Sequence, residues 1–171
     1  MTTQSQPRAE ASSGGAVLLA TILASSMAFI DGSALNVALP ALQADLGLNG
    51  SQLLWVTNAY LLVLSALILL GGSLGDHYGR KRVFGIGIGV FTLASMACGF
   101  AQDANFLILM RAVQGIGGAL LVPGSLAIIS AYFPPDRRGK AIGTWSTFST
   151  LTTLGGPILG GWLAGHGLWR V

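Results

Sequence analysis

Long apolar runs separated by short polar segments make up most of this chain. About 20 apolar residues span the ~30 Å hydrocarbon core of a bilayer as a helix. Runs of at least about that length cover 16–38, 52–74, 83–101, 106–131 and 141–164. The pattern therefore predicts five membrane-spanning helices, with Pro40 ending the first of them. Residues 1–15 are polar and predict a disordered tail.

The first run has a second interpretation, as a cleavable signal peptide. Arg8 would supply its basic region. Asp31 and Asn36 lie inside the run and argue against this interpretation.

Composition supports a polytopic, all-α membrane protein with the lipid bilayer as its surroundings. Hydrophobic residues make up 52% of the 171 residues and charged residues only 9%, whereas soluble domains carry about 25% charged residues. The net charge of +3 could suit nucleic acid, but the basic residues lie in short loops, so we expect no nucleic-acid partner. No arrangement of residues suggests an enzyme or a metal site.

The basic residues also predict how the chain is oriented. They cluster in the tail and in the connections after the second and fourth runs: Arg8, Arg80, Lys81, Arg82, Arg137, Arg138 and Lys140. The connections after the first and third runs contain Asp45 and Asp103 and no Lys or Arg. The positive-inside rule then places the N-terminus in the cytoplasm.

Asp31 and Arg111 are charges inside apolar runs, where each is costly unless it faces a partner or a polar cavity. At 1.5 Å per residue they lie ~12 Å and ~8 Å below the outer surface, so they could meet. Gln114 lies one turn from Arg111 on the same face. Three interpretations are open: a carboxylate whose protonation biases a conformation, a static ion pair, or an arginine that snorkels outward.

The connection after the second run has the sequence Gly-Ser-Leu-Gly-Asp-His-Tyr-Gly-Arg-Lys-Arg over 72–82. Asp76 can pair with the nearby basic residues, and Gly79 permits a tight reversal. This loop closely resembles the signature loop of the major facilitator superfamily, in which Gly, Asp, Gly and two basic residues recur at this spacing. His77 departs from the basic residue usual there.

Four more segments resemble motifs of the fourteen-span drug:proton antiporters of that superfamily. They are 31–40 and 55–60, which resemble first- and second-helix motifs, 111–119, which resembles the fourth-helix motif, and 155–161, which resembles the fifth-helix antiporter motif. Ser33 stands where Thr is commoner, and Thr152 replaces a small Gly. The five motifs occur in the right order on the right spans.

The resemblance implies a partial N-terminal helix bundle of a major facilitator fold, lacking helix six and the C-terminal bundle, so we expect residues 16–171 to be a fragment of a longer transporter. It implies proton-coupled efflux of drug-like or amphipathic small molecules across the cell membrane by alternating access, with the proton as coupling ion and no other cofactor.

The implied coupling and substrate-path residues are Asp31, Asn36, Arg111 and Gln114. The implied cytoplasmic gate comprises Gly72, Asp76, Gly79, Arg80 and Lys81, and the implied antiporter hinge comprises Gly156, Pro157, Gly160 and Gly161. The alternatives are transport of one specific metabolite by the same fold, or a non-transporting membrane fragment.

Overall fold

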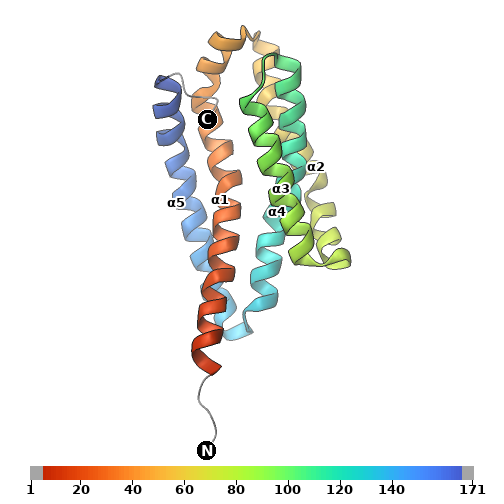
Figure 1. Cartoon of the computed structure of the whole chain (residues 1–171), viewed down its shortest axis with the longest axis vertical. Helices are drawn as coiled ribbons and strands as arrows, with labels where there is room; N and C mark the ends of the chain where they lie inside the picture. The colour runs from red at the N-terminus through yellow and green to blue at the C-terminus, as the bar shows by residue number, and fades with distance from the viewer. Residues whose placement is uncertain (1–5, 167–171) are drawn as a thin grey trace, which may run out of the picture.

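The computed structural model describes residues 6–166, with side chains from residue 14 onward. Within that range the chain forms a bundle of long helices without strands (Figure 1). They are α1 (Gln6–Leu46), α2 (Gly50–Tyr78), α3 (Arg80–Gly99), α4 (Ala104–Tyr132) and α5 (Pro135–Gly165). The predicted all-α fold is confirmed.

Local signals explain where the helices begin. Asn49 starts α2 with a capping box, because its side chain accepts from the Gln52 backbone while the Gln52 side chain accepts from the Asn49 backbone. Asp103 caps α4 by accepting from the Phe106 backbone. Gly79 separates α2 from α3 with φ of 95°, a value that favours glycine, so the predicted reversal is present.

The helices pack in two groups. α4 lies along α2 and α3, whereas α1 packs chiefly along α5. Figure 1 shows α1 and α5 side by side, with α2, α3 and α4 together beside them. α1 also touches α4, and this is the main contact between the two groups.

Within residues 6–166, α1 (from Gly14), α2, α3 and α4 are long and apolar enough to cross a membrane. The fifth predicted span, 141–164, lies within α5, whose 31 residues give sufficient length. The mean hydropathy of α5 is too low for it to be identified as a membrane span by composition, because Gly, Ser and Thr occupy much of the helix. The crossing by α5 stays a prediction.

The first helix differs from the prediction at both ends. α1 continues through Pro40 instead of ending there. Proline removes one backbone hydrogen bond, but the turn beyond it packs well: Leu42 is 1% exposed in a cluster with Leu48, Val56 and Leu107. At the other end, residues 6–15 of the expected tail belong to the helix, and residues 1–5 lie outside the described range.

Candidate functional site

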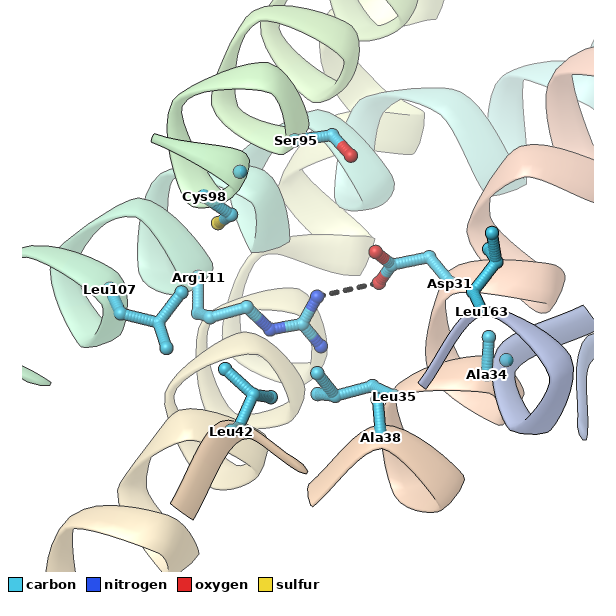
Figure 2. Close-up of a pocket in the computed structure, with 12 residues that line it drawn as sticks. Asp31, Ala34, Leu35, Ala38, Leu42, Ser95, Cys98, Leu107, Arg111 and Leu163 are labelled. Carbon is cyan, nitrogen blue, oxygen red and sulfur yellow. Dashed lines mark hydrogen bonds and ion pairs between the residues drawn. The ribbon is translucent and has the colours of Figure 1, made fainter. Parts of the chain in front are cut away.

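Asp31 and Arg111 meet between α1 and α4. The Arg111 Nη1 donates to Asp31 Oδ2 at 2.6 Å and to Gln114 Oε1 at 2.8 Å. The Gln114 amide donates to Asp31 Oδ1 at 2.8 Å, which closes a ring of three side chains. The predicted pairing is therefore present, and Figure 2 shows the carboxylate and the guanidinium pointing at each other.

Two groups on α2 hold the guanidinium as well. The Arg111 Nε donates to the Val56 carbonyl at 3.2 Å, and the guanidinium carbon lies 4.7 Å from the centre of the Tyr60 ring. A cation over an aromatic face is stabilised, more so where water is excluded. Arg111 is thus fixed by α2 and α4 independently of Asp31, so only one of its partners comes from α1.

The members of the cluster differ in exposure. The Arg111 side chain is 3% exposed and the Asp31 side chain 20%, while Gln114 is fully buried. This burial excludes the alternative in which Arg111 snorkels outward. The carboxylate is the part of the ion pair that remains accessible.

Asn36 does not join the cluster, although we expected it on the coupling or substrate path. It lies on an exposed part of α1, where its amide donates to the Gly32 carbonyl at 2.9 Å. An amide that bonds to the preceding turn of its own helix is satisfied locally. No hydrogen bond described for Asn36 reaches Asp31 or Arg111.

The loop between α2 and α3 brings together most of the predicted gate residues. Arg80 donates through Nε and Nη2 to Asp76 Oδ1 at 3.0 and 2.8 Å, and through Nη1 to the Ala127 carbonyl of α4 at 3.1 Å. Gly79 forms the turn, whereas Lys81 is exposed and Gly72 faces open space. Arg80 therefore joins the loop to α4.

The predicted hinge glycines line the contact between α5 and α1. A Cβ at Gly156 would collide with Ser33, and one at Gly160 would lie 2.7 Å from the Ala34 carbonyl. Gly161 faces Val37 less tightly, and Pro157 lies inside α5 on its exposed side. Small residues let helix backbones approach closely in lipid. Gly156 and Gly160 thus set the separation of these two helices.

A set of hydroxyl groups escaped the sequence analysis. Ser25 of α1 bonds to Ser125 of α4 at 2.7 Å and accepts from the Trp145 indole of α5 at 3.1 Å. Thr152 donates to Ser26 across α1 and α5 at 3.1 Å. A clue was available in the sequence, since adjacent serines in an apolar run need partners when the helix is buried.

Comparison with known proteins agrees with this architecture. The family model described as Major Facilitator Superfamily matches residues 21–171. The chain belongs to the major facilitator superfamily. Its members are transporters, not enzymes.

Individual relatives and a solved structure match as well. The chain is 40% identical over 154 residues to the puromycin resistance protein pur8 of Streptomyces alboniger, covering 90% of this chain and 31% of that protein. It is 37% identical over 153 residues to the riboflavin transporter RibZ of Clostridioides difficile, covering 90% of this chain and 34% of that protein. A crystal structure of a bacterial homolog to the human lysosomal transporter Spinster, in an inward-facing and occupied conformation, superposes with a TM-score of 0.77 at 28% identity, covering 88% of this chain and 33% of that one. The chain thus spans about a quarter to a third of the length of the relatives it matches.

Proposed function

We propose that the protein to which this chain contributes is a proton-coupled exporter of drug-like or amphipathic small molecules. The observation that carries the proposal is the arrangement of Asp31, Arg111 and Gln114. When the Asp31 carboxylate is ionised, it attracts the Arg111 guanidinium. When the carboxylate takes up a proton, that attraction weakens. Protonation therefore changes the free energy of the contact between α1 and α4.

The partners of Arg111 make this change tolerable. A buried charge stripped of its partner is strongly destabilising. Arg111 keeps the Val56 carbonyl, the Gln114 side chain and the Tyr60 ring when Asp31 is neutral. Protonation can then release α1, together with the α5 helix packed on it, without leaving the guanidinium unsatisfied.

The other predicted residues fit this scheme. Arg80 ties the α2–α3 loop to α4 on the side that we assign to the cytoplasm. Gly156 and Gly160 hold α5 close to α1, so the two helices can move as one unit. We place the protein in the cell membrane with its N-terminus in the cytoplasm, the proton as its coupling ion and small molecules as its cargo. The puromycin resistance relative supports a drug-like cargo.

The test is transport by the full-length protein in sealed vesicles with an imposed pH gradient. Efflux of puromycin should follow the gradient in the unsubstituted protein and become uncoupled from it in Asp31→Asn. Gln43→Ala is the matched control on the same helix, because Gln43 is an exposed residue of α1 that lies outside the cluster and outside the predicted path. Unchanged proton coupling in Asp31→Asn would remove Asp31 from the mechanism.

A second candidate cargo is one specific metabolite, which the riboflavin transporter relative favours. The same vesicles distinguish the two. An exporter of drug-like compounds moves several unrelated aromatic cations, whereas a dedicated transporter moves riboflavin or another single compound and is not inhibited by puromycin.

A further inference from the structure

A cavity of about 530 Å³ lies where the turn between α2 and α3 meets the last turns of α4. Its wall includes three consecutive basic residues, Arg80, Lys81 and Arg82, together with Ile128, Ala131 and Tyr132 of α4. Ile128 lies ~25 Å farther along α4 than Arg111, so the cavity is separate from the ion-pair cluster. Figure 1 shows this turn and the end of α4 in the half of the molecule nearer the N-terminus.

The positive charges at this cavity lack a counter-charge within the described part of the chain. Arg80 pairs with Asp76 and also donates to the Ala127 carbonyl. Lys81 and Arg82 are exposed and take part in none of the ion pairs between residues 14 and 166. None of the described residues that line the cavity is acidic. An anion in the cavity would supply the missing charge.

The place of these residues in α3 adds to the need for an anion. Arg80, Lys81 and Arg82 form the first turn of α3, which contains no acidic residue and has no side-chain cap. The amino end of a helix carries a partial positive charge, so it repels cations and stabilises anions. An anion would therefore be attracted by the helix end as well as by the two side chains.

The cavity lies at the depth expected for lipid headgroups. Tyr78 and Tyr132 line it and are both exposed, and tyrosines are enriched where a membrane meets water. In the orientation given by the basic loops, this is the inner side of the membrane. The inner leaflet carries anionic lipids, and basic pockets between helices on that side suit their headgroups.

The surface of α3 beside the cavity suits an acyl chain. Gly85 and Gly89 follow Lys81 at intervals of about one turn, and nothing lies within 4 Å of a Cβ at either position. Ile86, about one turn beyond Arg82, is exposed. Residues four apart lie on the same face of a helix, so the basic side chains continue into an open apolar strip. A phospholipid could use both features, whereas a free phosphate ion could use only the first.

We propose that this cavity binds the phosphate headgroup of one anionic phospholipid from the inner leaflet. Lys81 and Arg82 are its cationic partners, and an acyl chain lies along Gly85 and Gly89. The inference goes beyond the proposed function, because binding of the lipid requires neither proton coupling nor a particular cargo. The alternative occupant is the remaining part of the transporter, which would exclude lipid from the same residues.

Native mass spectrometry of the full-length protein in detergent tests the site. Phosphatidylglycerol or phosphatidylethanolamine is titrated in, and the dissociation constant of the tightest bound lipid is measured. The unsubstituted protein should bind phosphatidylglycerol more tightly than phosphatidylethanolamine. Lys81→Gln combined with Arg82→Gln should weaken phosphatidylglycerol binding about 25-fold, which corresponds to ~2 kcal/mol for two basic residues near a membrane surface.

The matched control removes the same two kinds of charge elsewhere on the same side of the membrane. Lys140→Gln combined with Arg137→Gln changes exposed residues at the start of α5 that lie outside this cavity. Phosphatidylglycerol binding should change by no more than about twofold, because charges beyond a Debye length are largely screened. Lys81→Arg combined with Arg82→Lys keeps both charges and should keep the lipid.

Four results would overturn the site. Equal losses in the two charge-removing variants would show that only the total surface charge matters. Equal binding of the two lipids by the unsubstituted protein would show that no anion is required. Unchanged binding in Lys81→Gln with Arg82→Gln would show that the lipid lies elsewhere, as expected if the rest of the transporter covers the cavity. Displacement of phosphatidylglycerol by inorganic phosphate would indicate a site for free anions.

These results are independent of the transport results, since the measurement counts bound lipid. Loss or retention of proton coupling in Asp31→Asn leaves the lipid site unaffected. Loss of the lipid site would likewise leave the roles proposed for Asp31 and Arg111 unchanged.

Discussion

α4 and α1 are held by their neighbours in different ways. In its most apolar stretch α4 has 50% of its residues buried, against 33% in α1. Glycines bring the α4 backbone against α2 and α3, as at Gly117, where a Cβ would lie 2.6 Å from the Phe91 nitrogen. The contact between α1 and α4 includes two polar interactions. In one, Asp31 bonds to Arg111 and Gln114, and in the other, Ser25 bonds to Ser125.

The difference indicates which part of the bundle can move. Close packing of backbones is lost steeply as helices separate. Polar contacts can be broken by a proton or exchanged with water. In the proposed mechanism, α2, α3 and α4 are therefore the fixed group, and α1 with α5 is the group whose position responds to protonation.

The largest expected effect comes from removing the guanidinium. Arg111→Leu leaves Asp31 and Gln114 without their main partner, and we expect a loss of about 3–5 kcal/mol in the free energy of unfolding. Asp31→Asn should cost about 2 kcal/mol or less, because Arg111 keeps its contacts on α2 and α4. Chemical unfolding in detergent micelles measures both, and equal losses would contradict the assignment of Arg111 to the fixed group.

A methyl group inside the fixed group is the next most disruptive change. Gly117→Ala pushes α3 away from α4, and we expect a loss of about 1–3 kcal/mol from overpacking. Gly143→Ala is the control, since nothing lies within 4 Å of a Cβ there. It should be neutral or stabilising by up to ~1 kcal/mol. Thermal unfolding followed by circular dichroism separates the two, and equal melting temperatures would show that α3 and α4 are not held by backbone contact.

A smaller effect is expected where α5 meets the hydroxyl groups. Trp145→Phe keeps most of the aromatic packing and loses the hydrogen bond to Ser25, so we expect about 1 kcal/mol of destabilisation. Trp55→Phe serves as the control, because that side chain is 51% exposed. Unfolding in detergent gives the comparison. Equal free energies of unfolding in the two variants would show that the hydrogen bond from the Trp145 indole to Ser25 does not stabilise the packing of α5 on α1.

The smallest effect belongs to the α2–α3 loop. The side chains of Arg80 and Asp76 are 40% and 61% exposed, and exposed ion pairs contribute at most about 1 kcal/mol. Asp76→Asn should therefore change stability by less than that amount, while any role in gating would appear in transport rates. Asp136→Asn, at the looser 3.9 Å pair with Arg137, is the control. A loss of several kcal/mol in Asp76→Asn would show that the loop is a structural support.

Much of this fold could be predicted from local patterns. The apolar runs located the helices, Gly79 located the turn, and counting residues along two runs brought Asp31 and Arg111 to similar depth. Pro40 was misjudged because a missing backbone bond is a local cost, while the packing of Leu42 and Leu48 that offsets it involves α2 and α4. Asn36 shares a run with Asp31 but lies on an exposed face of α1, outside the ion-pair cluster, so its place on the substrate path stays a prediction.

The sequence by itself determined the family and the number of helices between residues 6 and 166. It also determined that Asp31 and Arg111 are charges within apolar segments, where each is costly unless it has a partner. These follow from hydrophobic period, charge position and motif spacing, which act within one segment of chain. Tertiary structure decided that α1 pairs with α5, that Val56 and Tyr60 share the guanidinium, and that Asp31 is more exposed than Arg111. Such choices depend on which faces of separate helices approach, and no single segment carries that information.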